Sequence, residues 1–379
     1  MTNLGVGIIG CGNISTAYLT LAPLFRGLEM RAVADINAEA VAARAGEFGV
    51  RAYTVDELLD ADDIDVIVNL TIPDAHFSVS AAILEAGKHV YSEKPFVLSL
   101  DKGEALHKLA AGRGLRVGSA PDTFLGGSHQ QARALIDGDA IGRITSGTAH
   151  VMSRGMEAWH PNPGFFFQPG GGPVLDLGPY YITNLVQLLG PVRRVAALSS
   201  AAFHTRTIGT GPLAGQAVPV NTPTTIHALL EFVSGASITF SSSWDVSAHR
   251  HAPMELYGTG GSLFVPDPNF FGGALEMAGG DRVIRPVEAW QHPFGIPNEE
   301  KDGVWRANYR VAGLADMAAA IAQGRPHRCS LELALHVIDV MTSILKSGEA
   351  GAFVDLSTTC DRPEVLLPEE AASLLRAAP

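Results

Sequence analysis

One stretch near the N-terminus decides the fold, and it reads Val6-Gly7-Ile8-Ile9-Gly10-Cys11-Gly12-Asn13-Ile14-Ser15. Its apolar start predicts a buried strand, and an amphipathic helical pattern follows the glycines. Gly10 permits a tight turn, and Gly12 lets the backbone approach a pyrophosphate that the N–H groups at the helix N-terminus can hold. Ser15 stands where the third glycine of the G-x-G-x-x-G pattern is usual. This order of strand, glycine turn and helix predicts a phosphate-binding turn.

The same alternation of strand and helix patterns continues through residues 1–122. The predicted strands are Val6–Ile9, Met30–Ala34, Asp65–Leu70, His89–Tyr91 and Leu115–Ser119. The predicted helices are Ala17–Phe25, Ala38–Glu47, Val55–Leu59, Ala75–Ala86 and Leu100–Ala111. Thr54 and Glu57 have the spacing of a capping box, which supports the third helix. Apolar strands separated by helices are typical of a parallel sheet covered on both faces, so we predict an α/β, Rossmann-type domain here.

An acidic residue follows the second predicted strand. Asp35 lies about 20 residues beyond the glycine turn, where a carboxylate accepts hydrogen bonds from a ribose 2′-hydroxyl. A carboxylate there repels a 2′-phosphate, so the sequence favours NAD over NADP as the cofactor. The alternative is a glycine turn that only packs the strand on the helix.

The composition excludes several classes of function. The 379 residues suffice for two domains, and the formal net charge of −12 argues against nucleic acid and membrane as partners. The three cysteines (Cys11, Cys329 and Cys360) form no Cys-x-x-Cys pair and indicate reduced thiols in the cytoplasm. The histidines include no His-Glu-x-x-His spacing, so we expect no metal. No apolar run approaches the ~18 residues that cross a bilayer.

A lysine follows the strand predicted at His89–Tyr91, in Ser92-Glu93-Lys94-Pro95. At the carboxyl end of a parallel strand, the Lys94 side chain is expected to point into the cofactor crevice. Its ammonium can hydrogen-bond a substrate hydroxyl or alkoxide and lower the pKa of that hydroxyl. The alternative is a solvated surface lysine.

The chain resembles the Gfo/Idh/MocA family of glucose-fructose oxidoreductases, inositol dehydrogenases and their relatives. The resemblance covers essentially the whole chain, and its motifs are Gly10–Ser15, Thr71–His76, Glu93–Pro95, Gly170–Gly178 and Gly324–Pro326. It implies an NAD-binding Rossmann domain at residues 1–122 and a substrate-binding and oligomerisation α+β domain at residues 123–379. It also implies a large open, mostly antiparallel sheet in the second domain, through which a homodimer or homotetramer forms.

The resemblance assigns catalytic roles to Lys94 and to residues of a helix that begins within the glycine-rich stretch Gly170–Gly178. Asp176 matches the family's aspartate, whereas Tyr180 stands at the usual histidine and Thr183 at the usual second acid. The glucose-fructose oxidoreductases also carry tyrosine at that histidine position. The spacing places residues 176, 180 and 183 on one face of a helix. Pro179 predicts a kink in this helix, unless the helix begins only at that residue.

We therefore expect Tyr180 to act as the acid–base group, assisted by Lys94. A free phenol has a pKa near ~10, and an ammonium and the positive nicotinamide ring would both lower the pKa of this one. Asp176 would orient the substrate or balance the charge of Lys94. The alternative for Tyr180 is a core tyrosine whose hydroxyl finds a partner.

Further polar residues are expected around these three. The predicted cofactor-binding residues are Gly10, Gly12, Asn13, Ile14, Asp35, Thr71, Ile72, His76, Glu93 and Lys94. The predicted substrate-binding residues are Lys94, Asp122, His160, Asp176 and Tyr180. His76 is expected to cap a helix or brace the cofactor pocket. The aromatic and histidine side chains of the loop Trp159–Pro163 either contact a sugar ring or hold the loop in its own conformation.

The periodicity changes from about Arg143, where strand patterns follow one another. The predicted strands are Ile144–Met152, Val192–Ser199, Thr225–Phe232, Ser237–Trp244 and Met254–Tyr257, and the predicted helices are Trp305–Gln323 and Leu331–Ser347. The glycine cluster Gly258–Ser262 predicts a hairpin turn. The segments Phe203–Pro223 and Pro286–Gly303 predict long excursions that serve as a lid or an oligomer contact.

The leading interpretation is an NAD-dependent dehydrogenase that oxidises a secondary alcohol of a small polyhydroxylated substrate, namely a sugar, a sugar derivative or a cyclitol. One alternative is an enzyme that cleaves glycosides with internally recycled NAD. The other is a non-catalytic sensor of NAD and sugar, which has no need of an acid–base set.

Overall fold

The computed structural model describes residues 3–376, which divide into two compact units. The first unit contains the chain up to Gly127, the segment Gln291–Leu335 and the segment from Pro363 onward. The second contains Ser128–Trp290 and His336–Arg362. The first unit thus contains three separate segments of the chain, whereas the sequence predicts a single division after residue 122.

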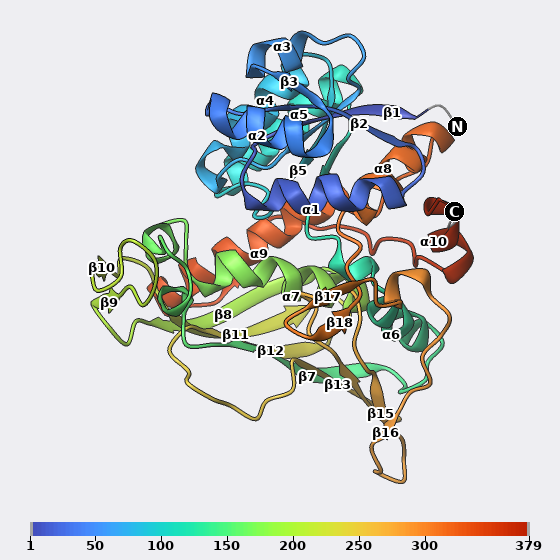
Figure 1. The fold of residues 1–379 in the computed structure, drawn as a ribbon. Helices are drawn as coiled ribbons and strands as arrows, with labels where there is room; N and C mark the ends of the chain where they lie inside the picture. Colours follow the sequence, from blue (N-terminus) through green and yellow to red (C-terminus); the bar gives the residue numbers. More distant parts are fainter. Residues whose placement is uncertain (1–2, 377–379) are drawn as a thin grey trace. The chain divides into compact units, whose positions relative to one another are not determined.

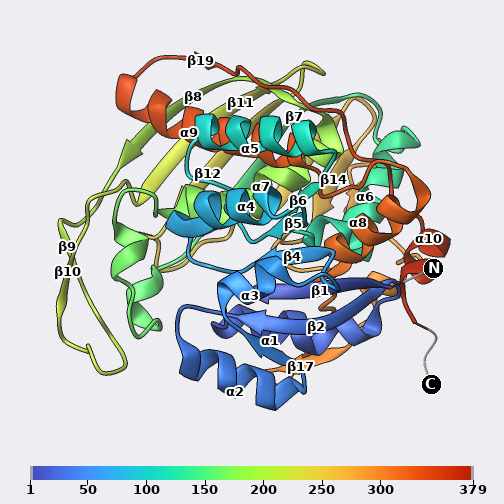
Figure 2. The same cartoon turned by 90° about the horizontal axis from the view of Figure 1, so that it is seen from above.

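A six-stranded parallel sheet forms the centre of the first unit, with the strand order β3-β2-β1-β4-β5-β6 (Figure 1). Its strands are β1 (Leu4–Ile9), β2 (Leu28–Ala34), β3 (Arg51–Tyr53), β4 (Val66–Asn69), β5 (His89–Ser92) and β6 (Val117–Ser119). Its helices include α1 (Asn13–Leu21), α2 (Ala38–Phe48), α3 (Val55–Asp60), α4 (His76–Glu85) and α5 (Leu100–Arg113). Helices α1 and α2 lie on one face of the sheet, and α4 and α5 on the other (Figure 2). The predicted Rossmann fold is confirmed, and the strand order reverses between β1 and β4, where such sheets bind ligands.

Local signals account for most of these elements. The capping box is present, because Thr54 Oγ1 accepts the Glu57 N–H and the Thr54 N–H donates to the Glu57 carboxylate. Strand β3 is absent from the predicted set. It lies at the edge of the sheet with Arg51 and Ala52 exposed, so no apolar run marks it in the sequence.

The helix predicted over Trp305–Gln323 begins only at Ala312. The remaining elements of the first unit are α8 (Ala312–Gln323), α10 (Pro368–Leu374), β17 (Glu299–Lys301) and β18 (Val304–Arg306). The Asp122 carboxylate holds the start of α8, where it accepts the N–H groups of Val311 and Gly313 at 2.9 and 3.0 Å. Val311 has a φ of 97°, which a helix cannot contain. The apolar pattern therefore overestimates the helix at its N-terminus.

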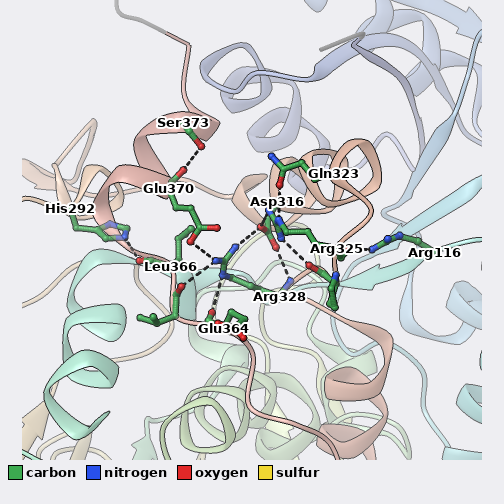
Figure 3. A network of polar contacts seen from close by, with 12 residues as sticks. Arg116, His292, Asp316, Gln323, Arg325, Arg328, Glu364, Leu366, Glu370 and Ser373 are labelled. Carbon is green, nitrogen blue, oxygen red and sulfur yellow. Dashed lines mark hydrogen bonds and ion pairs between the residues drawn. The ribbon is translucent and has the colours of Figure 1, made fainter. Parts of the chain in front are cut away.

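A buried ionic network joins the chain beyond α8 to the C-terminal segment (Figure 3). The fully buried Asp316 carboxylate lies 2.7 Å from both the Arg325 and the Arg328 guanidinium groups. Arg328 also contacts Glu370 of α10 at 2.7 Å. These contacts connect two of the three segments of the first unit, which no short-range pattern relates.

A nine-stranded sheet forms the centre of the second unit, with the order β16-β15-β14-β13-β7-β12-β11-β8-β19. The central strands are β7 (Ile144–Met152), β8 (Val192–Ser200), β11 (Thr225–Phe232), β12 (Ser237–Ser243) and β13 (Met254–Gly258). The outer strands are β14 (Ser262–Val265), β15 (Glu276–Ala278), β16 (Arg285–Pro286) and β19 (Val354–Asp355). Further elements are α6 (Gly127–Asp137), α7 (Pro173–Leu189), α9 (Leu331–Ala350) and the two-stranded sheet of β9 (Thr205–Thr207) and β10 (Ala217–Pro219).

The predicted open, mostly antiparallel sheet is confirmed, with one parallel pair, β7 and β12. Strands β13 and β14 are joined by the predicted hairpin turn. Helix α7 packs against β7, β11 and β12 on one face of the sheet (Figure 1). The residues between Ser153 and Gly172 precede α7 and include the short 3-10 helices η4 (Met156–Ala158) and η5 (Gly164–Phe167).

Three observations limit what the described residues can do. No helix within residues 3–376 has the length and apolarity that crossing a membrane requires. The same residues contain no group of three or more His, Cys, Asp or Glu side chains arranged to hold a metal ion. All three cysteines are buried thiols outside any disulfide.

Candidate active site

The glycine turn at the end of β1 is open on the side where a phosphate would approach. Gly10 has a φ of 110°, and a Cβ there would lie 2.6 Å from the Leu70 backbone, so the turn requires glycine. A Cβ at Gly12 would meet nothing within 4 Å, and no side chain caps the N-terminus of α1. Ser15 is fully buried and donates its hydroxyl to the Gly12 carbonyl at 2.6 Å, which holds the turn. The turn therefore fits a pyrophosphate at the helix N-terminus.

Asp35, just after β2, is fixed beside this turn. One carboxylate oxygen accepts the Cys11 N–H at 2.7 Å, and the other accepts the Asn37 N–H at 2.9 Å. Each oxygen keeps a lone pair, so the half-buried carboxylate can still accept the hydroxyl groups of a ribose. The residues present thus fit an adenine dinucleotide with an unmodified ribose.

His76 links the two loops that follow β4 and β5. Its ring is buried, with Nδ1 at 2.7 Å from the Pro95 carbonyl oxygen and Nε2 at 2.9 Å from the Thr71 carbonyl oxygen. Ile72, between these anchors, leaves 68% of its side chain exposed. His76 thus braces the loops, and the exposed Ile72 offers an apolar contact for a ring.

Asn69 is a positioning residue for this loop that the sequence does not point to. Its fully buried amide donates to the His76 carbonyl and the Ser80 hydroxyl, both at 3.0 Å, and accepts the Thr71 N–H and hydroxyl. One side chain therefore sets the loop that contains Thr71 and Ile72. The signal in the sequence is an amide at the carboxyl end of the apolar strand β4.

Lys94 lies half-buried beyond β5, with a carboxylate beside it. Glu93 accepts the Lys94 N–H at 2.9 Å and the Tyr18 hydroxyl at 3.2 Å. Burial, followed by the charge of Glu93, raises the pKa of Tyr18 well above the usual value of a phenol. Tyr18 therefore remains a neutral donor that orients Glu93 under the loop carrying Lys94.

Asp122 has a place that differs from the one expected. It is only 3% exposed, and its carboxylate accepts hydrogen bonds from the backbone at the start of α8 instead of facing solvent. Burial raises the pKa of Asp122 to about 6, although the hydrogen bond from the Gly313 N–H acts in the opposite direction. We assign it a bracing role.

Helix α7 supplies the second group of candidate residues. It is continuous from Pro173 to Leu189 with Pro179 inside, so the alternative start at Pro179 is wrong. Of its 17 residues, those outside the buried set are Asp176, Leu177 and Tyr180. The predicted polar pair thus occupies the open stripe of an otherwise buried helix. Thr183, the next residue on that face, is 4% exposed.

An aromatic loop precedes α7 and carries His160. The ring of His160 lies 5.5 Å from Trp159, 5.7 Å from Phe165 and 5.3 Å from Phe166. The Phe166 carbonyl accepts the N–H of Gly172, the N-cap of α7, at 2.8 Å. The loop is therefore fixed to the end of the helix where Asp176 stands.

The candidate residues thus form two groups. The first unit brings together the glycine turn, Asp35, the Thr71–His76 loop, Glu93 and Lys94. The second unit contains His160 in the loop ahead of α7, and Asp176 and Tyr180 on the helix itself.

Two family models match this chain. Residues 4–120 match the oxidoreductase family with an NAD-binding Rossmann fold, and residues 129–264 match the GFO/IDH/MocA C-terminal domain. The chain belongs to the Gfo/Idh/MocA oxidoreductase family.

Curated relatives within this family include sugar and inositol enzymes. Levoglucosan dehydrogenase of Pseudarthrobacter phenanthrenivorans is 26% identical over 290 residues, which cover 69% of this chain and 73% of that protein. Inositol 2-dehydrogenase of Rhizobium meliloti is 25% identical over 280 residues, covering 74% and 80%. An uncharacterized oxidoreductase of Schizosaccharomyces pombe, C115.03, is 28% identical, and the match spans 42% of its length and 41% of this chain.

Solved Gfo/Idh/MocA structures share the fold. Levoglucosan dehydrogenase in complex with NADH and L-sorbose superposes with a TM-score of 0.80 at 24% identity, covering 94% of this chain and all of that one. Aldose-aldose oxidoreductase from Caulobacter crescentus superposes with a TM-score of 0.74 at 21% identity, covering 93% and 100%.

Proposed function

We propose that this chain is an NAD-dependent dehydrogenase that oxidises a secondary alcohol of a sugar, a sugar derivative or a cyclitol. With NAD bound, the nicotinamide would accept the hydride, and Tyr180 or Lys94 would take the hydroxyl proton. The observation that carries the proposal is the open stripe of α7, where Asp176 and Tyr180 keep solvent access on a helix that is otherwise buried. A polar pair kept open in this way favours chemistry on a small molecule over a role in packing.

The cofactor preference rests on Asp35. Its carboxylate, held by two backbone N–H groups, accepts ribose hydroxyls and repels a 2′-phosphate, which favours NAD over NADP. The dinucleotide supplies the hydride-accepting ring when it is bound. The N-terminus of α1 would hold the pyrophosphate, and the exposed Ile72 would pack on a face of one of the cofactor's rings.

The chain's own residues position the alcohol and take its proton. Lys94 hydrogen-bonds the reacting hydroxyl and stabilises the developing alkoxide through its positive charge. Tyr180, in its phenolate form, accepts the hydroxyl proton. Asp176, one helical turn earlier, accepts a hydrogen bond from a neighbouring hydroxyl and so orients the ring.

The test is Tyr180→Phe, measured as initial rates with NAD and a sugar that the wild type oxidises. The phenylalanine keeps the ring and removes the hydroxyl, so the expected result is a fall in kcat of about 100-fold or more with a small change in KM. Thr183→Val, on the same face of α7 but buried, is the matched control. An unchanged kcat in Tyr180→Phe would remove this residue from the mechanism.

We also propose a cytoplasmic homodimer or homotetramer, formed through the sheet face opposite α7. Leu198 and Leu229 are 73% and 53% exposed on this face. With His227 and Phe353 they line an apolar hollow of about 380 Å³. Sedimentation of Leu198→Glu tests the assembly, because a charge there should dissociate it. The three cysteines are buried and form no disulfide, which supports a reducing compartment.

A further inference from the structure

The loop ahead of α7 exposes aromatic side chains, and buried residues beneath them hold the loop in place. Trp159 is 62% exposed and Phe165 is 54% exposed, with the half-buried His160 between them. The Phe165 ring packs on Phe166 at 4.0 Å, and Phe166 in turn meets the buried Trp244 at 5.9 Å. A continuous series of ring contacts thus leads from the surface into the core of the second unit.

Two kinds of contact hold this loop in place. Met156, Phe167 and Trp244 pack in one buried cluster with Ile208 and Val218 of the Phe203–Pro223 excursion. A buried guanidinium adds a polar connection, because Arg206 of β9 contacts Glu157 at 2.8 Å and also Asp245 after β12. The loop is therefore pre-organised, which lowers the entropic cost of binding a ligand.

The loop also presents a hydrogen-bond donor. The Asn162 N–H donates to His160 Nδ1 at 3.1 Å. In the neutral ring, Nε2 then carries the proton and can donate to a hydroxyl oxygen. Flat apolar rings beside a fixed donor match the surface of a sugar, which is apolar on its C–H faces and polar at its edge.

The position of the loop along α7 decides which part of a substrate it can bind. Gly172, whose N–H donates to the Phe166 carbonyl, precedes Tyr180 by about 12 Å along the helix axis. That distance exceeds the width of one six-membered ring. A molecule that uses both ends of this stretch therefore has a second ring.

We propose that Trp159, His160 and Phe165 form a subsite for a second ring attached to the oxidised one, so that the substrate is a glycoside or a disaccharide. This inference rests on the proposed function and names its substrate class. Trp159 and Phe165 contact the C–H face or aromatic aglycone of the second ring, and His160 donates to one of its hydroxyls. Binding energy from this remote ring then positions the reacting carbon.

The test compares a free sugar with its phenyl glycoside by calorimetric titration and by NADH formation. The expected result is tighter binding of the glycoside by the wild type, and a loss of about fivefold to tenfold in that affinity in Trp159→Ala. Trp159→Phe should restore most of it. Trp305→Ala is the matched control, because Trp305 is also exposed, at 61%, and belongs to the first unit.

The outcomes separate this inference from the proposed function. Equal affinities for the sugar and the glycoside, or a glycoside affinity that Trp159→Ala leaves unchanged, would overturn the subsite even if NADH forms. If the glycoside affinity depends on Trp159 but the protein never forms NADH, the subsite is supported and the proposed dehydrogenase activity is contradicted. A change of oligomeric state in Trp159→Ala with unaltered binding would make the loop a contact between copies and overturn the inference.

Discussion

His76 and Pro95 are joined by a buried hydrogen bond of 2.7 Å between the ring Nδ1 and the carbonyl oxygen. The opposite ring nitrogen lies 2.9 Å from the Thr71 carbonyl, so one side chain ties the loop after β4 to the loop that carries Lys94. A neutral imidazole donates through one nitrogen only, whereas the protonated ring donates to both carbonyls. The geometry makes His76 a brace between two cofactor-facing loops.

Replacing His76 with phenylalanine should weaken NAD binding without touching the cofactor. The aromatic ring keeps the volume, but the hydrogen bond from the histidine ring to a buried carbonyl is lost, which costs about 1–3 kcal/mol of unfolding free energy. We expect a rise in the Kd for NAD in calorimetry and a lower urea midpoint. Ser78→Ala, at an exposed position of the same helix, should leave both quantities unchanged. An unaltered Kd in His76→Phe would show that the loops need no brace.

Asp35→Asn should shift the cofactor preference toward NADP. The amide oxygen can still accept the Cys11 N–H, so the turn persists, while the negative charge that repels a 2′-phosphate is gone. We expect the ratio of kcat/KM for NADP to that for NAD to rise by about tenfold or more, the effect of about 1.4 kcal/mol. A ratio that stays constant would mean that another residue excludes the phosphate.

Asp122→Asn should change how stability depends on pH. The folded-state pKa of Asp122 is raised to about 6, above its ordinary value of 3.8, so the folded protein binds the proton more tightly than the unfolded chain. This contribution to stability is present below the unfolded pKa and is lost as pH rises through about 6. The unfolding free energy of the wild type relative to the variant should therefore fall, by at most about 3 kcal/mol, between about pH 4 and pH 7. Urea titrations across this range measure the difference, and parallel profiles would contradict the assignment.

Asp316→Asn should be strongly destabilising, because it leaves two buried or partly buried guanidinium groups without their shared carboxylate (Figure 3). We expect a loss of about 3–5 kcal/mol of unfolding free energy. Asp281→Asn breaks a pair with Arg285 of the same 2.7 Å length, but both side chains are more than half exposed. That control should cost less than about 1 kcal/mol, and equal losses would contradict the role of burial.

The sequence predicts well the features that short-range patterns encode. The run from Val6 to Ser15 identifies the first strand, the turn and the helix, and the spacing of Asp176 and Tyr180 correctly predicts one shared helical face. These features depend on residues within one or two helical turns of each other.

The features that escape prediction depend on contacts between distant residues. The late start of α8 follows from hydrogen bonds between Asp122 and Val311, 189 positions apart. The parallel pairing of β7 with β12 joins strands that are separated by α7, β8 and β11. Arg206 and Asn69 are ordinary polar residues in the sequence, and only their buried partners reveal what they hold.

The most direct test of the central claim is absorbance at the NADH band, with purified protein, NAD and a panel of sugars, glycosides and cyclitols. Lys94→Ala is measured alongside, with NAD binding followed in both proteins. The account predicts that the wild type forms NADH with at least one member of the panel and that the variant binds NAD but forms none. NAD binding by the wild type with no NADH from any member would contradict a dehydrogenase and favour an enzyme that recycles its NAD internally, or a sensor.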